Sequence, residues 1–148
     1  MEMFTVRATA ATAAKQVKRG LEGWETTRPA GRIQFHFDRD RVCVVTALSV
    51  EESARRKGIA TRLVHEMCAF LRRRRIWRIE LDNMTDPGND FYPRLGFVWD
   101  EVDAEGVPGG PEMSARTHVV LRRSGRVPLA VEPGTLRFTV HKIEIKKQ

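Results

Sequence analysis

The chain has 148 residues, of which 41% are hydrophobic and 30% are charged, and this composition predicts a folded domain rather than a disordered chain. No apolar run approaches the roughly 18 residues that cross a bilayer, and the N-terminus lacks the apolar run of a secretory signal, so we expect a cytoplasmic protein without a membrane partner. The net charge of +7 favours an anionic partner such as nucleic acid or a phosphorylated ligand.

The N-terminal half of the sequence alternates between extended and helical patterns. Alternating apolar residues and β-branched runs indicate strands, whereas a segment rich in alanine, lysine and glutamine with apolar residues four apart indicates a helix. These patterns predict, in chain order, a strand at 4–7, a helix at 8–21, a loop at 26–31 and strands at 33–37 and 42–50. Because residues 42–50 are almost all apolar, we expect a central strand that is buried on both faces.

The C-terminal half begins with a strongly periodic helix. One helical face carries Ile59, Leu63, Met67, Phe70 and Leu71, and the four arginines at 72–75 suit a helix C-terminus. The patterns that follow predict a strand at 76–81, a short helix at 91–95, a strand from residue 97, a loop at 100–113 and strands at 117–121 and 136–145. The whole order predicts a mixed α/β domain in which helices cover a sheet.

The two cysteines and four histidines show no metal-binding spacing, so we predict no metal site. Cys43 and Cys68 each lie inside an apolar pattern, which indicates buried thiols in a reducing compartment. The arginine run at 72–75 has two interpretations: it is either a solvated helix end or a site for nucleic acid.

The stretch EESARRKGIATRL, residues 51–63, places three cations directly before a glycine and the start of a helix. The first N–H groups of a helix have no internal partner, and the macrodipole adds about half a positive charge, so such a start binds anions. Gly58 permits close approach of a phosphate, and Ala60 is small enough not to obstruct it. The stretch therefore predicts a phosphate-binding loop, and the alternative is a surface helix with a basic N-terminus.

Two motifs in this region resemble one known family. Arg55-x-x-Gly58-x-Ala60 matches the Arg/Gln-x-x-Gly-x-Gly/Ala signature of the GNAT superfamily of N-acetyltransferases, and residues 91–97, FYPRLGF, resemble its FYxxLGF segment. The resemblance extends from about Val42 to Phe97. It implies one domain over residues 1–148, with a core at 1–123 and an extra strand region at 124–148. The implied acyl-CoA N-acyltransferase fold has a mixed, mostly antiparallel sheet that is splayed at its middle and flanked by helices.

The resemblance implies that acetyl-CoA is the co-substrate and that no metal takes part. Loop amides would bind its pyrophosphate, and the bulged end of the preceding strand would pair with its pantetheine arm. An asparagine that the family has about seven residues before its tyrosine has two candidates here, although neither has this spacing. The implied contacts are Leu48, Ser49, Val50, Arg55, Arg56, Lys57, Gly58, Ile59, Ala60, Thr61, Asn83 and Asn89.

The same resemblance implies two catalytic residues. Tyr92 would protonate the leaving thiolate of CoA as a general acid. Glu80 is the preferred general base for the amine, ahead of Asp82 on the same face of its strand. The implied function is transfer of the acetyl group to a primary amine of a protein or a small molecule, by direct attack in a ternary complex.

Two alternatives stay open at the level of sequence. The first is a catalytically inactive module of the same fold that binds nucleic acid or another anion through the cations at 55–57 and 72–75. The second is a structural domain that forms a homodimer through the C-terminal strand as an exposed sheet edge. The sequence does not identify the amine acceptor.

Overall fold

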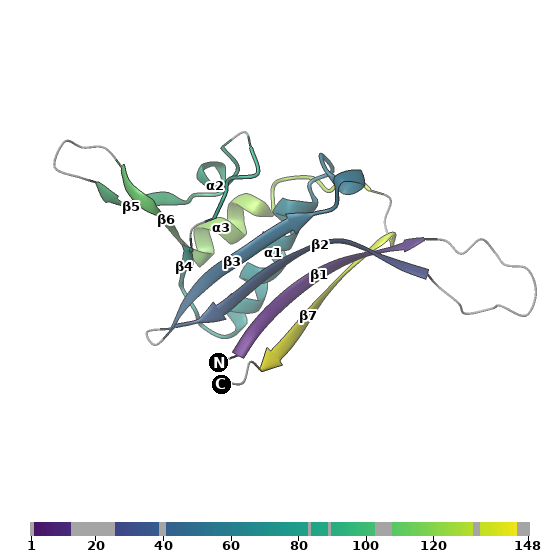
Figure 1. Cartoon of the computed structure of the whole chain (residues 1–148), viewed down its shortest axis with the longest axis horizontal. Helices are drawn as coiled ribbons and strands as arrows, with labels where there is room; N and C mark the ends of the chain where they lie inside the picture. Colours follow the sequence, from purple (N-terminus) through teal and green to yellow (C-terminus); the bar gives the residue numbers. More distant parts are fainter. Residues whose placement is uncertain are drawn as a thin grey trace, which may run out of the picture.

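The computed structural model describes residues 2–12, 26–38, 41–82, 84–88, 90–102, 108–131 and 134–144 (Figure 1). None of the described helices is long and apolar enough to cross a membrane. The elements of the described part are β1 (Glu2–Thr12), β2 (Thr26–Phe37), β3 (Val42–Val50), a 3-10 turn η1 (Glu52–Ala54), α1 (Ile59–Arg73), β4 (Arg78–Leu81), α2 (Phe91–Arg94), β5 (Val98–Val102), β6 (Pro108–Arg116), α3 (Thr117–Ser124) and β7 (Leu136–Glu144).

The strands form one mixed sheet in the order β5-β6-β4-β3-β2-β1-β7. Every neighbouring pair is antiparallel except β3 and β4, which are parallel and joined by α1, since parallel neighbours need a crossover connection. These two strands pair only between Val42–Val45 and Arg78–Leu81 and then separate. The predicted fold class, a mixed and mostly antiparallel sheet that is splayed at its middle and flanked by helices, is confirmed.

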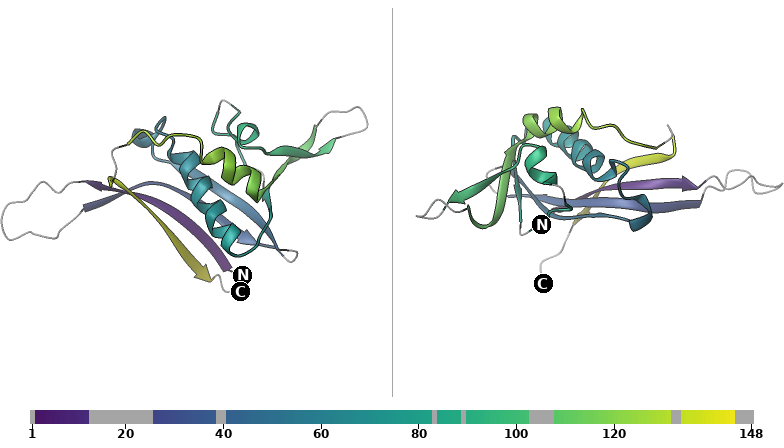
Figure 2. Two further views of the ribbon diagram at one scale, coloured as in Figure 1. Left: turned by 180° about the vertical axis from the view of Figure 1, so that it is seen from behind. Right: turned by 90° about the horizontal axis from the view of Figure 1, so that it is seen from above.

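The hydrophobic core lies on one face of the sheet. Figure 2 shows α1 and α3 on the same side of it. Alternate strand residues such as Phe4, Ile33 and Val45 are buried there with Leu63 and Met67 of α1. The prediction that β3 is buried on both faces is wrong, because only alternate residues in its first half are fully buried. The physical reason is that no described α-helix covers the opposite face of the sheet (Figure 2).

A cluster of aromatic rings lies under the C-terminal end of α1. Phe4 and Phe70 are in contact, with ring centroids 5.3 Å apart. The guanidinium carbon of Arg74 lies 4.5 Å from the centroid of the Phe70 ring and 5.3 Å from that of Phe4. Such cation–π contacts stabilise by about 0.5–1 kcal/mol at exposed sites. One of the four consecutive arginines therefore takes part in packing at this end of the core.

The predicted helix at 8–21 is wrong over the residues that the structure describes. Residues 8–12 continue β1, and residues 26–31, predicted as a loop, begin β2; residues 13–21 lie outside the described residues. The two strands form a long antiparallel pair in which Met3 is opposite His36 and Thr12 is opposite Thr26. Alanine and threonine favour neither state strongly, so pairing with β2 decides the conformation.

Two further predictions in the C-terminal half are wrong. Of residues 100–113, predicted as a loop, 100–102 belong to β5 and 108–113 to β6, which pair with each other, and 103–107 lie outside the described residues. Residues 117–121, predicted as a strand, form the first part of α3. This helix starts where Thr117 donates two hydrogen bonds to the chain after α1, from its N–H to Trp77 O (2.9 Å) and from Oγ1 to Ile76 O (2.8 Å). Val120 is then fully buried beneath the helix, as an apolar residue of an amphipathic helix requires.

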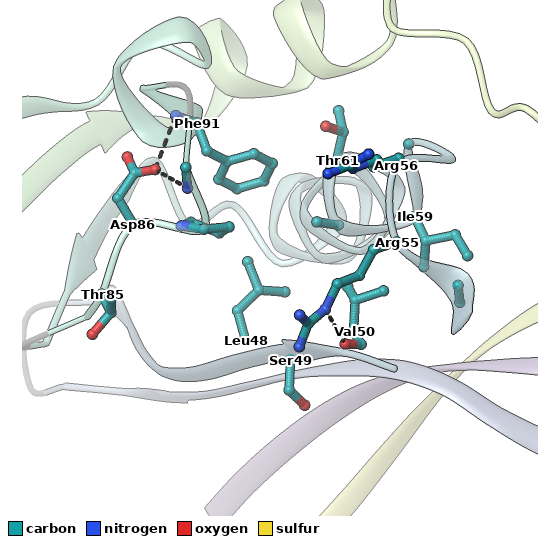
Figure 3. Close-up of a pocket in the computed structure, with 15 residues that line it drawn as sticks. Leu48, Ser49, Val50, Arg55, Arg56, Ile59, Thr61, Thr85, Asp86 and Phe91 are labelled. Carbon is teal, nitrogen blue, oxygen red and sulfur yellow. Dashed lines mark hydrogen bonds between the residues drawn. The ribbon is translucent and has the colours of Figure 1, made fainter. Parts of the chain in front are cut away.

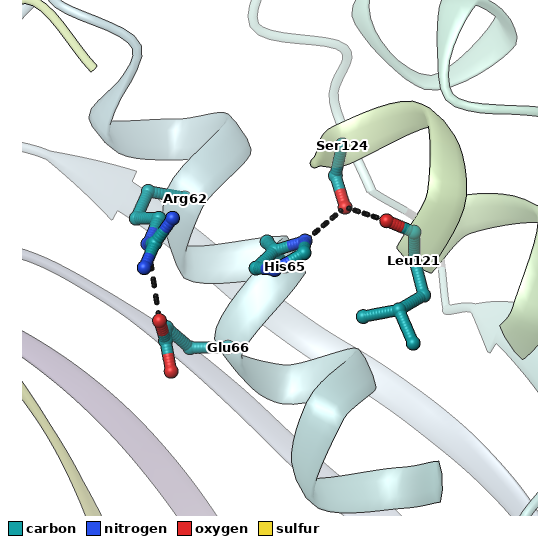
Figure 4. A network of polar contacts seen from close by, with 5 residues as sticks. All are labelled: Arg62, His65, Glu66, Leu121 and Ser124. Atoms are coloured by element: carbon teal, nitrogen blue, oxygen red, sulfur yellow. Dashed lines mark hydrogen bonds and ion pairs between the residues drawn. The ribbon is translucent and has the colours of Figure 1, made fainter. Parts of the chain in front are cut away.

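A polar contact joins α3 to α1 (Figure 4). His65 Nδ1 lies 2.8 Å from Ser124 Oγ, and that hydroxyl donates to Leu121 O at 3.2 Å. The contact between His65 and Ser124 connects the two helices. The ion pair between Arg62 and Glu66 lies on the same helix at 3.0 Å.

The predicted buried thiols are confirmed. Cys43 on β3 and Cys68 on α1 are free cysteines with no exposed surface. Burial raises the pKa of both thiols well above its ordinary value, and the neighbouring Cys68 raises that of Cys43 further. A thiol with a raised pKa is not a thiolate near neutral pH, so neither cysteine is an available nucleophile.

The last strand, β7, lies at the edge of the sheet beside β1. It agrees with the predicted strand over the described residues, and Val140 and Ile143 on it are exposed. An exposed edge is what the predicted homodimer requires. The homodimer itself stays a prediction, which sedimentation over a range of concentrations tests: a monomer throughout would remove it.

Candidate functional site

A pocket of about 710 Å³ opens where β3 and β4 separate (Figure 3). Three segments form its walls. The first is the end of β3, the second runs from the turn after β3 into the first turn of α1, and the third is the segment that leads into α2. The lining residues are Leu48, Ser49, Val50, Ala54, Arg55, Arg56, Gly58, Ile59, Ala60, Thr61, Thr85, Asp86, Pro87, Gly88 and Phe91.

The pocket exists because β4 ends before β3 does. The last bond between the two strands is from Asp82 N to Val45 O, at 3.0 Å. Beyond it, residues 47–50 stay paired with β2 on one edge, while no described strand lies along their other edge. Thr46 is an extra residue opposite the Gln34–Phe35 step, and such a bulge bends a strand. A bulge was predicted at the end of this strand, at residues 48–50, and the structure has it at Thr46, in the middle of the strand.

The start of α1 presents unused backbone donors to the same pocket. The first bond within the helix is from Arg62 N to Gly58 O, at 3.0 Å, so the N–H groups of residues 58–61 have no partner in the helix. Among the described residues, no side chain caps this end and no acidic residue stands in the first turn. Together with the positive end of the helix dipole, these donors form a site that favours an anion.

The basic residues before the helix have three different positions. Arg56 lines the pocket and has a left-handed backbone, with φ of 65°. Arg55 also lines it, but its Nε donates to Val50 O at 3.2 Å, so this side chain connects the loop to the end of β3 (Figure 3). Lys57 is exposed and does not line the pocket, and its carbonyl accepts a bond from Ala130 N at 2.8 Å. Of the three predicted counter-charges, Arg56 fits that role best.

The backbone conformation and the close packing at position 58 both require a glycine there. Its φ of 84° lies in the left-handed region that residues with a Cβ rarely adopt. A Cβ at this position would also lie 2.6 Å from the carbonyl oxygen of Pro128. The segment after α3 therefore packs directly against the turn that begins α1. The sequence motif alone gives no indication of this second constraint.

Asp86 is a pocket residue that sequence reasoning missed. Its Oδ1 accepts from Gly88 N at 2.7 Å and from Phe91 N at 3.2 Å (Figure 3). Its Oδ2 accepts from Tyr92 N at 3.3 Å. One carboxylate thus fixes the turn and the start of α2. The Asp-Pro-Gly sequence before a short helix was the available signal, since aspartate prefers such positions. Asn83 and Asn89, the predicted asparagine contacts, lie outside the described residues.

Tyr92 lies in the core next to the pocket wall. It is 2% exposed, and its ring packs edge-on against Phe91 (centroids 5.0 Å apart) and Phe97 (5.6 Å). Its hydroxyl is buried and has no hydrogen-bond partner among the described residues. Burial raises the pKa of the phenol well above its ordinary value, and the charge of Asp86 raises it further. The phenol therefore keeps its proton at neutral pH. Phe91 lines the pocket, whereas Tyr92 does not.

The two candidate bases lie on and just after β4. Glu80 is half-buried, and its Oε1 lies 3.1 Å from Arg78 Nε. It alternates with the buried residues Ile79 and Leu81, so it lies on the face of the sheet opposite α1. Asp82 is exposed, and neither carboxylate lines the pocket. The structure thus brings together the strand end, the loop and α2, but leaves Glu80 on the other face of the sheet.

Solved structures with this arrangement are N-acetyltransferases. A GNAT-family acetyltransferase from Staphylococcus aureus Mu50 has a TM-score of 0.50 and 16% identity, over 61% of this chain and 61% of that protein. GCN5 of Tetrahymena has a TM-score of 0.51 and 18% identity, over 77% and 69%. An aminoglycoside 6′-acetyltransferase type Ii has a TM-score of 0.50 and 22% identity, over 76% and 69%. These likenesses define the fold as that of acyl-CoA N-acyltransferases.

The chain covers less than two thirds of the length of the Staphylococcus aureus protein. A search of curated proteins by sequence gives no significant match. The sequence profile of the acetyltransferase (GNAT) family matches residues 9–97, which is more than half of the chain and contains the splayed strands, the loop and Tyr92. The chain belongs to the acetyltransferase (GNAT) family.

We expect Gly58→Ala to destabilise the protein more than Gly134→Ala. Gly134 has nearly the same φ, 85°, but a Cβ there would meet nothing within 4 Å. The left-handed backbone alone should lower the free energy of unfolding by roughly 1–2 kcal/mol in both variants. The Pro128 carbonyl adds a steric penalty at Gly58 only. Urea unfolding of the two variants measures the difference, and equal losses would show that residues 128–130 move aside freely.

Proposed function

We propose that this chain transfers the acetyl group of acetyl-CoA to a primary amine. One observation carries the proposal: the uncapped start of α1 and the unpaired edge of β3 line the same pocket. The first is a site for a doubly charged phosphate group, and the second offers backbone groups to an amide-containing chain. A cytoplasmic location is part of the same proposal. The acceptor is proposed no further than as a primary amine of a protein or a small molecule.

The residues present fit acetyl-CoA. The N–H groups of residues 58–61 and the Arg56 side chain would hold its pyrophosphate. The backbone of residues 48–50, whose outer edge has no described strand beside it, would pair with its pantetheine amides as an added strand does. Asn83 and Asn89 remain proposed contacts of the same arm. When bound, the thioester supplies the acyl group.

The proposed reaction needs no covalent intermediate on the protein. The amine nitrogen attacks the thioester carbonyl carbon, the carbon–sulfur bond breaks, and the departing thiolate takes a proton. Cys43 and Cys68 are both buried with a raised pKa, which argues against an acyl-cysteine and supports direct attack. No metal ligand cluster is found among the described residues.

Tyr92 is proposed as the acid that protonates the thiolate. Its phenol is protonated at neutral pH because burial and Asp86 both disfavour the phenolate. A buried hydroxyl without a partner is unfavourable by roughly 1–3 kcal/mol, and the thiolate that forms as the carbon–sulfur bond breaks would remove this cost by accepting its proton. Asp86 contributes as a positioning residue, since it holds the backbone of the residue before Tyr92 and of Tyr92 itself.

Glu80 is proposed as the base that removes the proton of the attacking amine. Its carboxylate is partly accessible to solvent, so a water molecule can carry the proton to it. The ion pair with Arg78 is exposed, and such a pair contributes little to stability. Breaking this pair during proton transfer would therefore change the stability of the fold only slightly.

Calorimetric titration with acetyl-CoA at two salt concentrations tests the proposal. We expect micromolar binding of about one ligand per chain that persists at the higher salt concentration, because oriented backbone N–H groups are less sensitive to screening than mobile surface charges. Absence of heat, or weak binding that the higher salt abolishes, would contradict the acetyl-CoA site. It would favour the alternative of a basic module for another anion.

We expect Tyr92→Phe to lower kcat well over tenfold, by analogy with the 10²–10⁴-fold typical of acid–base catalysis. Acetyl-CoA affinity should barely change, because the ring stays and the hydroxyl contacts no described residue. Stability should be unchanged or slightly higher, since an unsatisfied buried hydroxyl is removed. Steady-state kinetics and thermal unfolding measure both effects. A variant with the turnover of the wild type would rule out Tyr92 as the acid.

We expect Glu80→Gln to remove the acidic limb of the profile of kcat/KM against pH, because the base that must be ionised is lost. Turnover should fall by on the order of 10² near neutral pH. Asp82→Asn is the matched control: it makes the same change two residues away and should keep the limb. A Glu80→Gln enzyme with the same acidic limb as the wild type would exclude Glu80 and leave Asp82 or water as the base.

A further inference from the structure

A cluster of arginines and a tryptophan lies at the end of the sheet opposite the pocket. α1 starts at the pocket, runs for 15 residues, or about 22 Å, and ends in this region. We call this region the arginine end. It consists of Arg41, Arg72, Arg73, Arg75, Trp77 and Arg116.

Backbone pairing brings together the segments that carry Arg41, Trp77 and Arg116. Val42, which follows Arg41, is opposite Arg78, and Arg78 is opposite Arg116 on the next strand. The N–H of Thr117 donates to Trp77 O at 2.9 Å, which joins the start of α3 to the chain after α1. Because neighbouring strands are about 4.8 Å apart, the positions 42, 78 and 116 lie side by side at the sheet end, and Arg41 directly precedes this row.

The side chains of the arginine end are exposed to solvent. Trp77 is 53% exposed, although tryptophan is usually largely buried. The described residues include no ion-pair partner for Arg41, Arg72, Arg73, Arg75 or Arg116. Arg74 is excluded because it stacks on Phe70, and Arg78 because it is paired with Glu80. Asp38, in the turn before β3, is a carboxylate among the residues described at this end.

Helix-end electrostatics explains only part of this cluster. Cations after α1 are favoured by the negative end of its dipole, which accounts for Arg72 and Arg73. It does not account for Arg41, in the turn before β3, or for Arg116, at the end of β6. Arg78 and Arg116 lie directly opposite each other on paired strands, and the ion pair between Arg78 and Glu80 offsets the repulsion between them.

We propose that the arginine end binds single-stranded nucleic acid. The guanidinium groups would contact phosphates, and the exposed ring of Trp77 would stack with a base. An aromatic stacking surface beside cations distinguishes a single strand, whose bases are accessible, from a duplex, whose bases are not. This site does not depend on the proposed acetyl transfer, because the pocket and the arginine end share no residue.

Fluorescence anisotropy of a labelled single-stranded oligonucleotide tests this proposal. We expect binding that weakens as salt rises from about 50 to 200 mM, since counterions are released from the phosphates. Trp77→Ala should weaken binding by about tenfold, and Trp77→Phe should restore most of it, because a base can stack on either ring. Arg72→Gln with Arg73→Gln should lower the slope of log affinity against log salt by about 1.4, or roughly 0.7 for each phosphate contact.

The matched control removes the same charge elsewhere. Arg28 and Arg32 are exposed on β2, and Arg28→Gln with Arg32→Gln should leave the affinity within about twofold of the wild type. Thermal unfolding of each variant establishes that it is folded. The proposal fails if the wild type does not bind, if Trp77→Ala binds as the wild type does, or if the control weakens binding as much as the Arg72 and Arg73 changes. It also fails if polyglutamate or phosphatidylserine vesicles compete better than unlabelled oligonucleotide.

Discussion

The early end of the parallel pair β3–β4 is the constraint on which the site depends. The two strands pair over Val42–Val45 and Arg78–Leu81, and the extra residue Thr46 then bends β3. A parallel pair also requires a crossover, and the crossover is α1. The helix therefore starts beside the same gap that the strands open. An unpaired strand edge and an uncapped helix start, each of which needs a hydrogen-bond partner, are thereby placed on one pocket.

The segment after α3 packs against the turn that begins α1. Ala130 N donates to Lys57 O, and the Pro128 carbonyl occupies the space that a side chain at Gly58 would need. His65 and Ser124 connect α3 to the middle of α1. These contacts come from residues beyond the range that the family profile matches. The C-terminal segment thus contributes to the shape of the loop without lining the pocket.

Two groups of cations lie at the two ends of α1. At the N-terminal end, Arg56 and the helix dipole act together, although a cation is unfavourable at that position in the absence of an anion. At the C-terminal end, arginines are favoured by the dipole, and one of them, Arg74, stacks on the aromatic cluster. The net charge does not distinguish these two groups of cations. The direction of the helix does, because its dipole disfavours cations at the N-terminal end and favours them at the C-terminal end.

The sequence by itself determined the periodic and chemically marked elements: α1, β3, the short helix before Gly96 and the loop around Gly58. Their patterns are local, and each was predicted close to its observed bounds. Local pattern failed for residues 8–12 and 117–121, where pairing with β2 and the bonds of Thr117 to the chain after α1 decided the conformation. It also missed Asp86, whose three backbone contacts arise only when the turn closes. Three features depend on contacts between residues distant in sequence, so only the folded structure reveals them. Tyr92 is buried with an unpartnered hydroxyl, and Glu80 lies on the face of the sheet opposite α1. Pro128 packs against Gly58.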